Sequence, residues 1–177
     1  MATIISVQYG EMDSAIGLLT LLKTEEGLCR IDFGSIEENL PIINAWLKKQ
    51  SLKAELLYDQ DAFHPYIEQI EEYFLHRRQQ FDFPITLFGT PFQRKVWEGL
   101  RNIPYGETYS YKDVAIMIGS PKSVRAVGSA NNKNPLPIVF PCHRVIGSNG
   151  ELVGYGGGLD KKEVLLNLEK QPIQVCS

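Results

Sequence analysis

The feature that most constrains the fold is a change in the character of the sequence at residues 89–91, Gly-Thr-Pro. Before this point, stretches typical of strands alternate with stretches typical of helices, whereas short helices and turns follow it. Thr90 followed by Pro91 is a favoured cap and first-turn pair, so a new helix is expected to start here. We therefore predict two domains, residues 1–88 and residues 89–177, in this chain of 177 residues.

The first half predicts a mixed α/β scaffold. Residues 26–27, Glu-Gly, are typical of a turn between two strands, and Ser35 is a good cap for a helix in which Pro41 is unfavourable. No catalytic constellation occurs here, and we interpret His64 and His76 as surface or core residues. Strands are predicted within residues 3–9, 16–34 and 55–59, helices over residues 36–50 and 62–78, and an extended segment over residues 81–89.

Two short helices are predicted after a first helix over residues 92–103. Ser110 and Asp113 have capping-box spacing at the start of the first short helix, which ends at Gly119. The second covers residues 122–132, after a turn of a few residues. Two short helices across such a turn are typical of a helix-turn-helix, although an ordinary helical hairpin has the same spacing.

The second short helix has a nearly bare surface. Ala126, Gly128 and Ser129 carry little or no side chain, and Gly128 costs up to about 1 kcal/mol of helix stability relative to Ala. Arg125 projects from the same helix, and Lys133 follows it. Such a surface can closely approach a DNA groove or another helix, and the spacing of these residues does not decide between the two.

A cysteine after an apolar stretch is the main candidate for a reactive residue. Residues 136–141, Leu-Pro-Ile-Val-Phe-Pro, predict a short buried strand that ends at Cys142, with His143 directly after it. Cysteine reacts as the thiolate, and a neighbouring histidine favours that form. Adjacent side chains of a strand point to opposite faces, so His143 would act through a water or after a turn. The alternative is an inert structural thiol.

A glycine-rich loop, residues 148–158, follows the cysteine. It matches neither common phosphate-binding pattern, so we interpret its glycines as letting the backbone approach a flat ligand. Capping-box spacing at Asp160 and Glu163 predicts a last helix near residues 159–170.

The charge is divided unevenly between the halves. Residues 1–88 carry 7 Lys+Arg against 14 Asp+Glu, a net charge of −7, and residues 89–177 carry 11 against 7, a net charge of +4. This favours a polyanionic partner for the second half. The three cysteines are widely spaced, which argues against a disulfide framework or zinc site and for a reducing cytoplasm. Neither a membrane span nor a secretory signal is predicted.

Three stretches closely resemble the O6-alkylguanine-DNA alkyltransferases, also called methylated-DNA–protein-cysteine methyltransferases. They are VWEGLRNIPYGETYSY, SVRAVGSANNKNP and PCHRVIGSNGELVGYGGG, within a similarity over about residues 90–170. Within the family, the chain most resembles the bacterial constitutive type, because that type lacks the zinc-binding cysteines of animal members and this chain lacks a plausible set as well. The resemblance implies an α+β or α/β chain, with an N-terminal RNase-H-like α/β domain followed by a C-terminal winged helix-turn-helix alkyltransferase domain.

The resemblance also implies the reaction. The protein would move a methyl or other alkyl group, once and irreversibly, from O6-alkylguanine in DNA, and more weakly from O4-alkylthymine, to Cys142. His143 would be the base, acting through a water, with Glu169 orienting it and Tyr111 donating a proton to the leaving guanine. No metal and no cofactor are implied, and the protein is expected to be a cytoplasmic monomer that does not bind membranes.

The resemblance implies that the protein binds double-stranded DNA through the minor groove. Arg125 would take the place of the extruded base, and Tyr111 would push the 3′ phosphate. Some family members have serine at the position of Gly156, where this chain offers only its backbone. The implied DNA contacts are Arg125, Tyr111, Ser110, Ala126, Gly128 and Ser129, and the implied base pocket and its support are Asn134, Val145, Tyr155 and Gly156.

Two other classes of protein compete with this one. Cys, His and Glu also form a hydrolytic triad, so a cysteine hydrolase that turns over repeatedly is the first alternative. A DNA-binding regulator or damage-recognition module is the second, and the presence of Cys142 argues against it. Cys29 lies in a strand pattern and Cys176 in the C-terminal tail, so neither is expected to accept the alkyl group.

Overall fold

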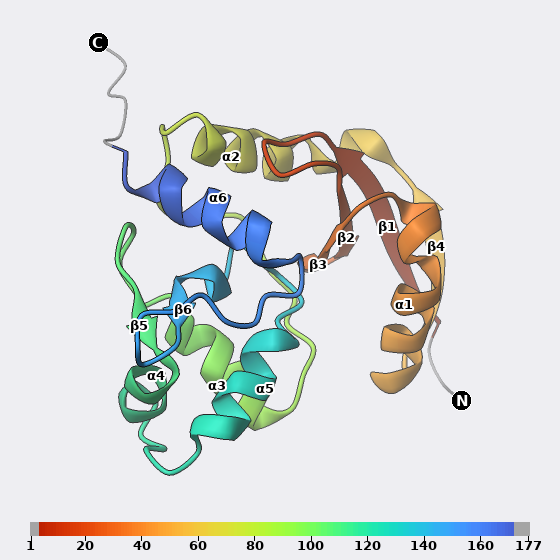
Figure 1. The fold of residues 1–177 in the computed structure, drawn as a ribbon. Helices are drawn as coiled ribbons and strands as arrows, with labels where there is room; N and C mark the ends of the chain where they lie inside the picture. The colour runs from red at the N-terminus through yellow and green to blue at the C-terminus, as the bar shows by residue number, and fades with distance from the viewer. Residues whose placement is uncertain (1–3, 172–177) are drawn as a thin grey trace. The chain divides into compact units, whose positions relative to one another are not determined.

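The computed structural model describes residues 4–171, and the chain divides into two compact units between Phe88 and Gly89 (Figure 1). Cys176 lies outside the described residues. Within the described part of the chain, no helix is long and apolar enough to cross a membrane.

The first unit is a four-stranded sheet with helices (Figure 1). The strand order is β3-β2-β1-β4, with antiparallel pairing along β1, β2 and β3 and parallel pairing of β1 with β4. The elements are β1 (Ile4–Met12), β2 (Leu19–Thr24), β3 (Gly27–Phe33), α1 (Ile36–Lys49), β4 (Lys53–Tyr58), the 3-10 helix η1 (Gln60–Phe63) and α2 (His64–Phe74).

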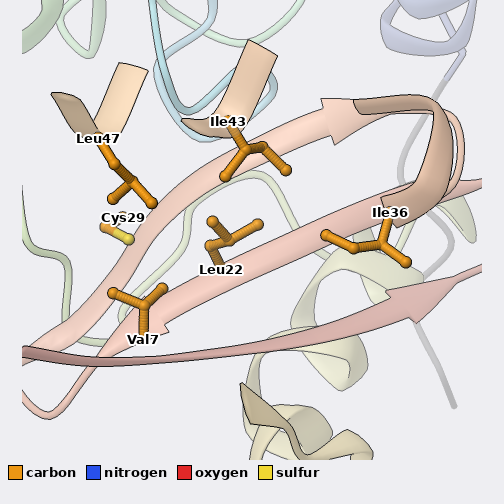
Figure 2. Close-up of a cluster of buried hydrophobic side chains, with 6 residues drawn as sticks. All are labelled: Val7, Leu22, Cys29, Ile36, Ile43 and Leu47. Carbon is orange, nitrogen blue, oxygen red and sulfur yellow. The ribbon is translucent and has the colours of Figure 1, made fainter. Parts of the chain in front are cut away.

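Helix α1 forms where the sequence predicts it. Ser35 accepts a hydrogen bond from the backbone of Glu38, whose carboxylate accepts from the Ser35 backbone in return, and this capping box starts the helix. Pro41 lies inside α1 without ending it, at the loss of one backbone hydrogen bond. The buried face of α1, with Ile36 and Ile43, packs against sheet residues in an apolar cluster (Figure 2).

The segment over residues 81–89, predicted to be extended, forms no regular strand. Its single pairing is an isolated bridge between Ile85 and Leu28 of β3. Gly27 permits this close approach, because its φ is +149° and a Cβ there would lie 2.5 Å from the backbone of Pro84.

The second unit is mainly helical. Trp97 of the first helix donates a hydrogen bond of 2.7 Å from its ring nitrogen to the backbone oxygen of Ala130, which ties two helices together in its core. Tyr109 and Ser110 pair in parallel with Val145 and Ile146. The elements are α3 (Pro91–Leu100), β5 (Tyr109–Ser110), α4 (Tyr111–Met117), α5 (Val124–Asn132), η2 (Cys142–Arg144), β6 (Val145–Ile146) and α6 (Leu159–Glu169).

Helices α4 and α5 form a helix-turn-helix pair. The capping box of Ser110 and Asp113 starts α4, and Gly119, at φ +75°, follows its end. Helix α5 starts at Val124, two residues later than predicted, because the residues before it form a turn in which the Ser123 amide donates to the Ser120 carbonyl.

The prediction of a strand over residues 136–141 is wrong. The segment turns back on itself, with an isolated bridge between Pro137 and Phe140 and a φ of +75° at Ile138. All six residues are buried, so the apolar composition reflects burial in a turn. The turn leads directly into the 3-10 helix η2, which starts at Cys142. The sequence had predicted the end of a strand at this position.

Candidate active site

Cys142 is a buried thiol at the start of η2. Its exposed fraction is 4%, and its backbone amide donates a 2.7 Å hydrogen bond to the carbonyl of Phe140. A 3-10 helix turns by about 120° per residue, so Cys142 and His143 do not point to opposite faces as they would on a strand. Both side chains therefore lie within one buried region.

Asn134 fixes the turn that precedes the cysteine. Its side-chain nitrogen donates to the carbonyl of Phe140 at 2.8 Å, and its side-chain oxygen accepts from the amide of Leu136 at 3.0 Å. The Asn134 side chain thus forms hydrogen bonds with two backbone groups of the buried turn. These two hydrogen bonds stabilise the turn that leads into Cys142.

The two residues that follow Cys142 belong to a buried ion cluster. The Nε2 atom of His143 is 2.7 Å from Oε1 of Glu169 on α6, and Arg144 donates to both oxygens of the same carboxylate at 2.8–3.2 Å. Arg144 also donates to the carbonyl of Ile103 at 2.8 Å. The Nδ1 atom of His143 is buried and has no hydrogen-bond partner among residues 4–171. Glu169 therefore orients the imidazole and leaves Nδ1 available to a further group.

Burial and charge set the protonation states of these groups. Burial raises the pKa of the Cys142 thiol to about 11, so the resting sulfur is protonated. Burial lowers the pKa of His143 below its usual 6.5 despite the contrary effect of Glu169. Burial alone would raise the pKa of Glu169, but hydrogen bonds from His143 and Arg144 lower it to about 2. At neutral pH the cluster is a thiol, a neutral imidazole and a carboxylate.

Tyr111, the first residue of α4, lies beside the glycine-rich loop. Its hydroxyl donates to the carbonyl of Val153 at 3.0 Å, and its ring lines an open hollow with Gly128 and Gly154. Burial raises the pKa of Tyr111, and the negative charge of a Cys142 thiolate raises it further. Tyr111 therefore connects the helix-turn-helix to the glycine-rich loop.

Two other residues predicted for the base pocket, Tyr155 and Gly156, lie within the same loop. Val145 is buried in β6 directly after η2, and Gly156 is exposed. Burial raises the pKa of Tyr155 well above 10, and the nearby Cys142 and Glu169 raise it further. Tyr155 is thus a half-buried residue of the loop, and its phenol is protonated at neutral pH.

Helix α5 carries the residues predicted to contact DNA. Arg125, Ala126 and Ser129 are exposed, and Gly128 is partly buried, where a Cβ would lie 3.8 Å from the Tyr111 ring. Ser110, which was also predicted to contact DNA, lies outside α5, and its hydroxyl caps α4. The small residues leave the backbone of α5 open to a close approach by another molecule.

Two site residues escaped the sequence interpretation. Arg144 holds Glu169, and Lys162 is fully buried on α6, where it donates to three backbone carbonyls. The spacing of Lys162, Leu165 and Glu169 along one face of the last helix is the signal that could have revealed the lysine. No group of three or more His, Cys, Asp or Glu residues that could hold a metal ion occurs within residues 4–171.

Comparisons with known proteins agree with this arrangement. The family model described as 6-O-methylguanine DNA methyltransferase, ribonuclease-like domain, matches residues 7–87, and the model of the DNA binding domain of the same family matches residues 91–171.

Individual proteins match over most of the chain. A methylated-DNA–protein-cysteine methyltransferase of Methanosarcina barkeri is 42% identical over 94% of this chain and 99% of its own length. The constitutive methyltransferase of Bacillus subtilis is 55% identical over 58% of this chain and 63% of its own. The crystal structure of Mycobacterium tuberculosis OGT in complex with DNA has 40% identity and a TM-score of 0.78, covering 94% of this chain and 93% of the other.

The fold and the site together define a class of protein: a ribonuclease-like domain is followed by a DNA-binding domain that contains a buried thiol, Cys142. The chain belongs to the 6-O-methylguanine DNA methyltransferase family. The family and the fold class that the sequence motifs indicated are both confirmed.

Proposed function

We propose that the protein repairs alkylated DNA directly, by moving a methyl or other alkyl group from O6 of guanine to the sulfur of its own Cys142. It is a methylated-DNA–protein-cysteine methyltransferase that acts once. The observation that carries the assignment to Cys142 is its buried thiol directly before a His143–Glu169 pair, in the same unit as a helix-turn-helix. O4-alkylthymine is a second, weaker substrate.

The reaction is an in-line displacement at carbon. The sulfur of Cys142 forms a bond to the alkyl carbon as the bond between that carbon and O6 breaks, and its electron pair passes to the guanine. An alkyl carbon has no carbonyl oxygen, so no oxyanion hole is needed, and a thiolate is a strong nucleophile for this step. The product is a thioether, which water does not hydrolyse, so each molecule reacts once.

His143 takes the thiol proton through a water. Its Nδ1 atom is the acceptor, since Nε2 faces the carboxylate of Glu169 and the imidazole is neutral. The carboxylate stabilises the imidazolium that forms, and Arg144 holds the carboxylate ionised. Tyr111 donates a proton to the leaving guanine and regains one through water from the protonated His143, so the proton lost by the thiol equals the proton gained by the guanine.

The helix-turn-helix presents the DNA to this site. Helix α5 enters the minor groove of double-stranded DNA, where the small residues Ala126, Gly128 and Ser129 allow a close approach. Arg125 fills the stack left by the flipped nucleotide, and Tyr111, with Ser110, contacts the backbone. Flipping is required because the target atom lies inside the duplex, at a cost of about a few kcal/mol.

The flipped base is held beside Cys142 by the segments that flank the cysteine. Val145, Tyr155 and the backbone of Gly156 form its pocket, and Asn134 keeps the turn before Cys142 in place. Residues 1–88 are a scaffold domain and residues 89–177 carry DNA binding and transfer. The protein acts as a monomer in the cytoplasm and needs no cofactor.

A stoichiometry measurement tests this function against a cysteine hydrolase. Purified protein is mixed with an excess of duplex DNA that contains O6-methylguanine, and restored guanine is counted. We expect a burst that stops at one equivalent of protein. Continued turnover, with the thiol regenerated, is the result that a Cys-His-Glu hydrolase gives, and it would overturn the proposal.

A further inference from the structure

A hollow of about 410 Å³ lies at one end of the sheet in the first unit. The residues that line it come from the start of β1, the turn between β2 and β3, and the segment that follows α2, so the hollow belongs to that unit alone. Its volume lies within the range of about 300–1,000 Å³ that is usual for small-molecule sites. The chemistry of its walls therefore indicates what kind of ligand it can hold.

One wall of the hollow is apolar. Ile5, Leu52 and Phe88 line it, pack against the apolar cluster of the unit and remain only partly buried. The ring of Phe88 meets that of Trp46 edge-on, with 5.7 Å between the ring centroids, and this contact holds it in position. The wall is therefore preformed, and it still has apolar surface to offer to a ligand.

Hydrogen bonds hold the polar side of the hollow together. The hydroxyl oxygens of Thr24 and Thr86 are 2.9 Å apart, which joins the turn between β2 and β3 to the segment that follows α2. The Glu26 amide donates to the Thr24 hydroxyl at 3.2 Å, and the Thr86 amide donates to the carbonyl of Leu28 at 2.8 Å. The polar side is therefore built from segments that are fixed to the sheet.

Two carboxylates make the hollow acidic. Glu25 and Glu26 line it from the turn, both are exposed, and neither forms a salt bridge within residues 4–171. Residues 1–88 carry a net charge of −7, which adds to the attraction of a cation. A neighbouring hollow that shares Leu52 has Lys48 and Lys53 against one glutamate in its lining, so it does not favour a positive ligand.

We propose that this hollow binds an organic ammonium ion, in which a charged amine is joined to an apolar body. The body lies against the apolar wall, and the ammonium lies among the carboxylates of Glu25 and Glu26 and the ring of Phe88, because an aromatic face attracts a cation. Two carboxylates are fewer oxygen ligands than a calcium site needs. The unit holds none of the residues proposed for alkyl transfer or DNA contact, so this inference does not rest on the proposed function.

The test is a titration of the full chain with phenethylammonium, followed through the NMR signals of the backbone amides. We expect shifts that saturate and that are confined to the surroundings of residues 4–6, 24–26 and 86–88. Phenethyl alcohol has the same body without the charge, and it should bind about tenfold more weakly, since two surface ion pairs together contribute about that factor. Equal affinities for the two probes, or shifts that do not saturate, would overturn the proposal.

Two double variants separate a local site from a general effect of charge. Glu25→Gln with Glu26→Gln should weaken the binding of phenethylammonium about tenfold and leave that of phenethyl alcohol unchanged. Glu68→Gln with Glu71→Gln removes the same charge from exposed positions of α2 that do not line the hollow, and it should bind like the original protein. Equal losses in the two double variants would mean that only the net charge matters, and would overturn the site.

Phe88→Leu tests the contact with the aromatic ring. It keeps an apolar wall and removes the aromatic face, so the affinity for phenethylammonium should fall by more than that for phenethyl alcohol. Equal falls would overturn the place of the ammonium on the ring. The titration needs neither DNA nor Cys142. A chain that binds phenethylammonium and accepts no methyl group would therefore refute the proposed function alone, and the reverse result would refute only this site.

Discussion

The two cysteines within residues 4–171 are both buried, and they lie in regions of opposite character. Cys29, fully buried in β3, belongs to an apolar cluster with Val7, Leu22 and Leu47 (Figure 2). Cys142 is almost as deeply buried, but its second unit also buries His143, Arg144, Lys162 and Glu169. Burial raises the pKa of both thiols, to about 12 for Cys29 and about 11 for Cys142.

The difference teaches that burial by itself does not decide whether a cysteine reacts. The side chains that pack around Cys29 in the cluster are apolar, whereas Cys142 is followed directly by a neutral histidine with an available ring nitrogen. Burial keeps both thiols protonated at neutral pH, which protects them from oxidation because the thiolate is the reactive form. In the second unit, the buried His143 supplies a proton acceptor next to Cys142, the residue proposed to accept the alkyl group.

The largest effect is expected from removal of the nucleophile. Cys142→Ser should abolish methyl transfer from DNA, because an alcohol is a far weaker nucleophile than a thiolate. Binding to the same duplex should persist, since α5 is unaltered. Transfer is followed with radiolabelled methyl DNA, and methylated protein from Cys142→Ser would break the contrast between the two cysteines.

The next largest effect is expected at Arg125, which lies outside the buried cluster. If it replaces the flipped base, Arg125→Ala should slow repair of duplex DNA by roughly ten- to a thousandfold, since extrusion costs about a few kcal/mol. Reaction with free O6-methylguanine base should fall little. Single-turnover rates at saturating duplex provide the measurement.

Lys122→Ala is the matched control, because Lys122 is an exposed cation just before the same helix. A cation that only contacts phosphate gives weaker binding, a lower salt slope and a rate restored at saturation. If Arg125→Ala behaves in this way, Arg125 does not take the place of the base.

A smaller effect is expected at Glu169. Glu169→Gln keeps the shape but loses the charge that orients His143 and pairs with Arg144, so transfer should slow by roughly 10- to 100-fold, less than the loss of a general base costs. Affinity for DNA should be unchanged. Single-turnover rates are compared with Glu163→Gln, an exposed position on the same helix, and equal rates for the two variants would remove Glu169 from the mechanism.

The smallest effect on transfer is expected at the other cysteine. Cys29→Ala should leave the transfer rate unchanged and lower the free energy of unfolding by about 1 kcal/mol, through a small cavity in the apolar cluster. Rate and urea unfolding are measured on the same sample. If Cys29→Ala loses much of its transfer rate while the protein is still fully folded, the two regions are not independent of each other.

The sequence predicts the elements whose signals are local. Ser35, Thr90 and Ser110 each start a helix through a capping box formed within four residues, and the predicted starts agree with the structure. The motif around Cys142 likewise indicated the family, because its residues are contiguous. Local signals of this kind need no knowledge of the rest of the chain.

Features that depend on distant contacts could not be predicted in the same way. The turn over residues 136–141 has the composition of a strand, and hydrogen bonds with the side chain of Asn134 stabilise it. Arg144 donates a hydrogen bond to Glu169, which lies 25 positions further along the chain, and Lys162 donates one to Val145, which lies 17 positions before it. Tertiary packing creates these contacts, so only the structure reveals the buried polar cluster.

One measurement tests the central claim most directly: peptide mapping by mass spectrometry after the intact protein has reacted with an excess of duplex O6-methylguanine DNA. The account predicts one methyl group per protein molecule, on the Pro141–Arg144 segment at Cys142, with Cys29 unmodified. A methyl group on Cys29 or Cys176 in place of Cys142, or an unmodified protein beside repaired DNA, would contradict it.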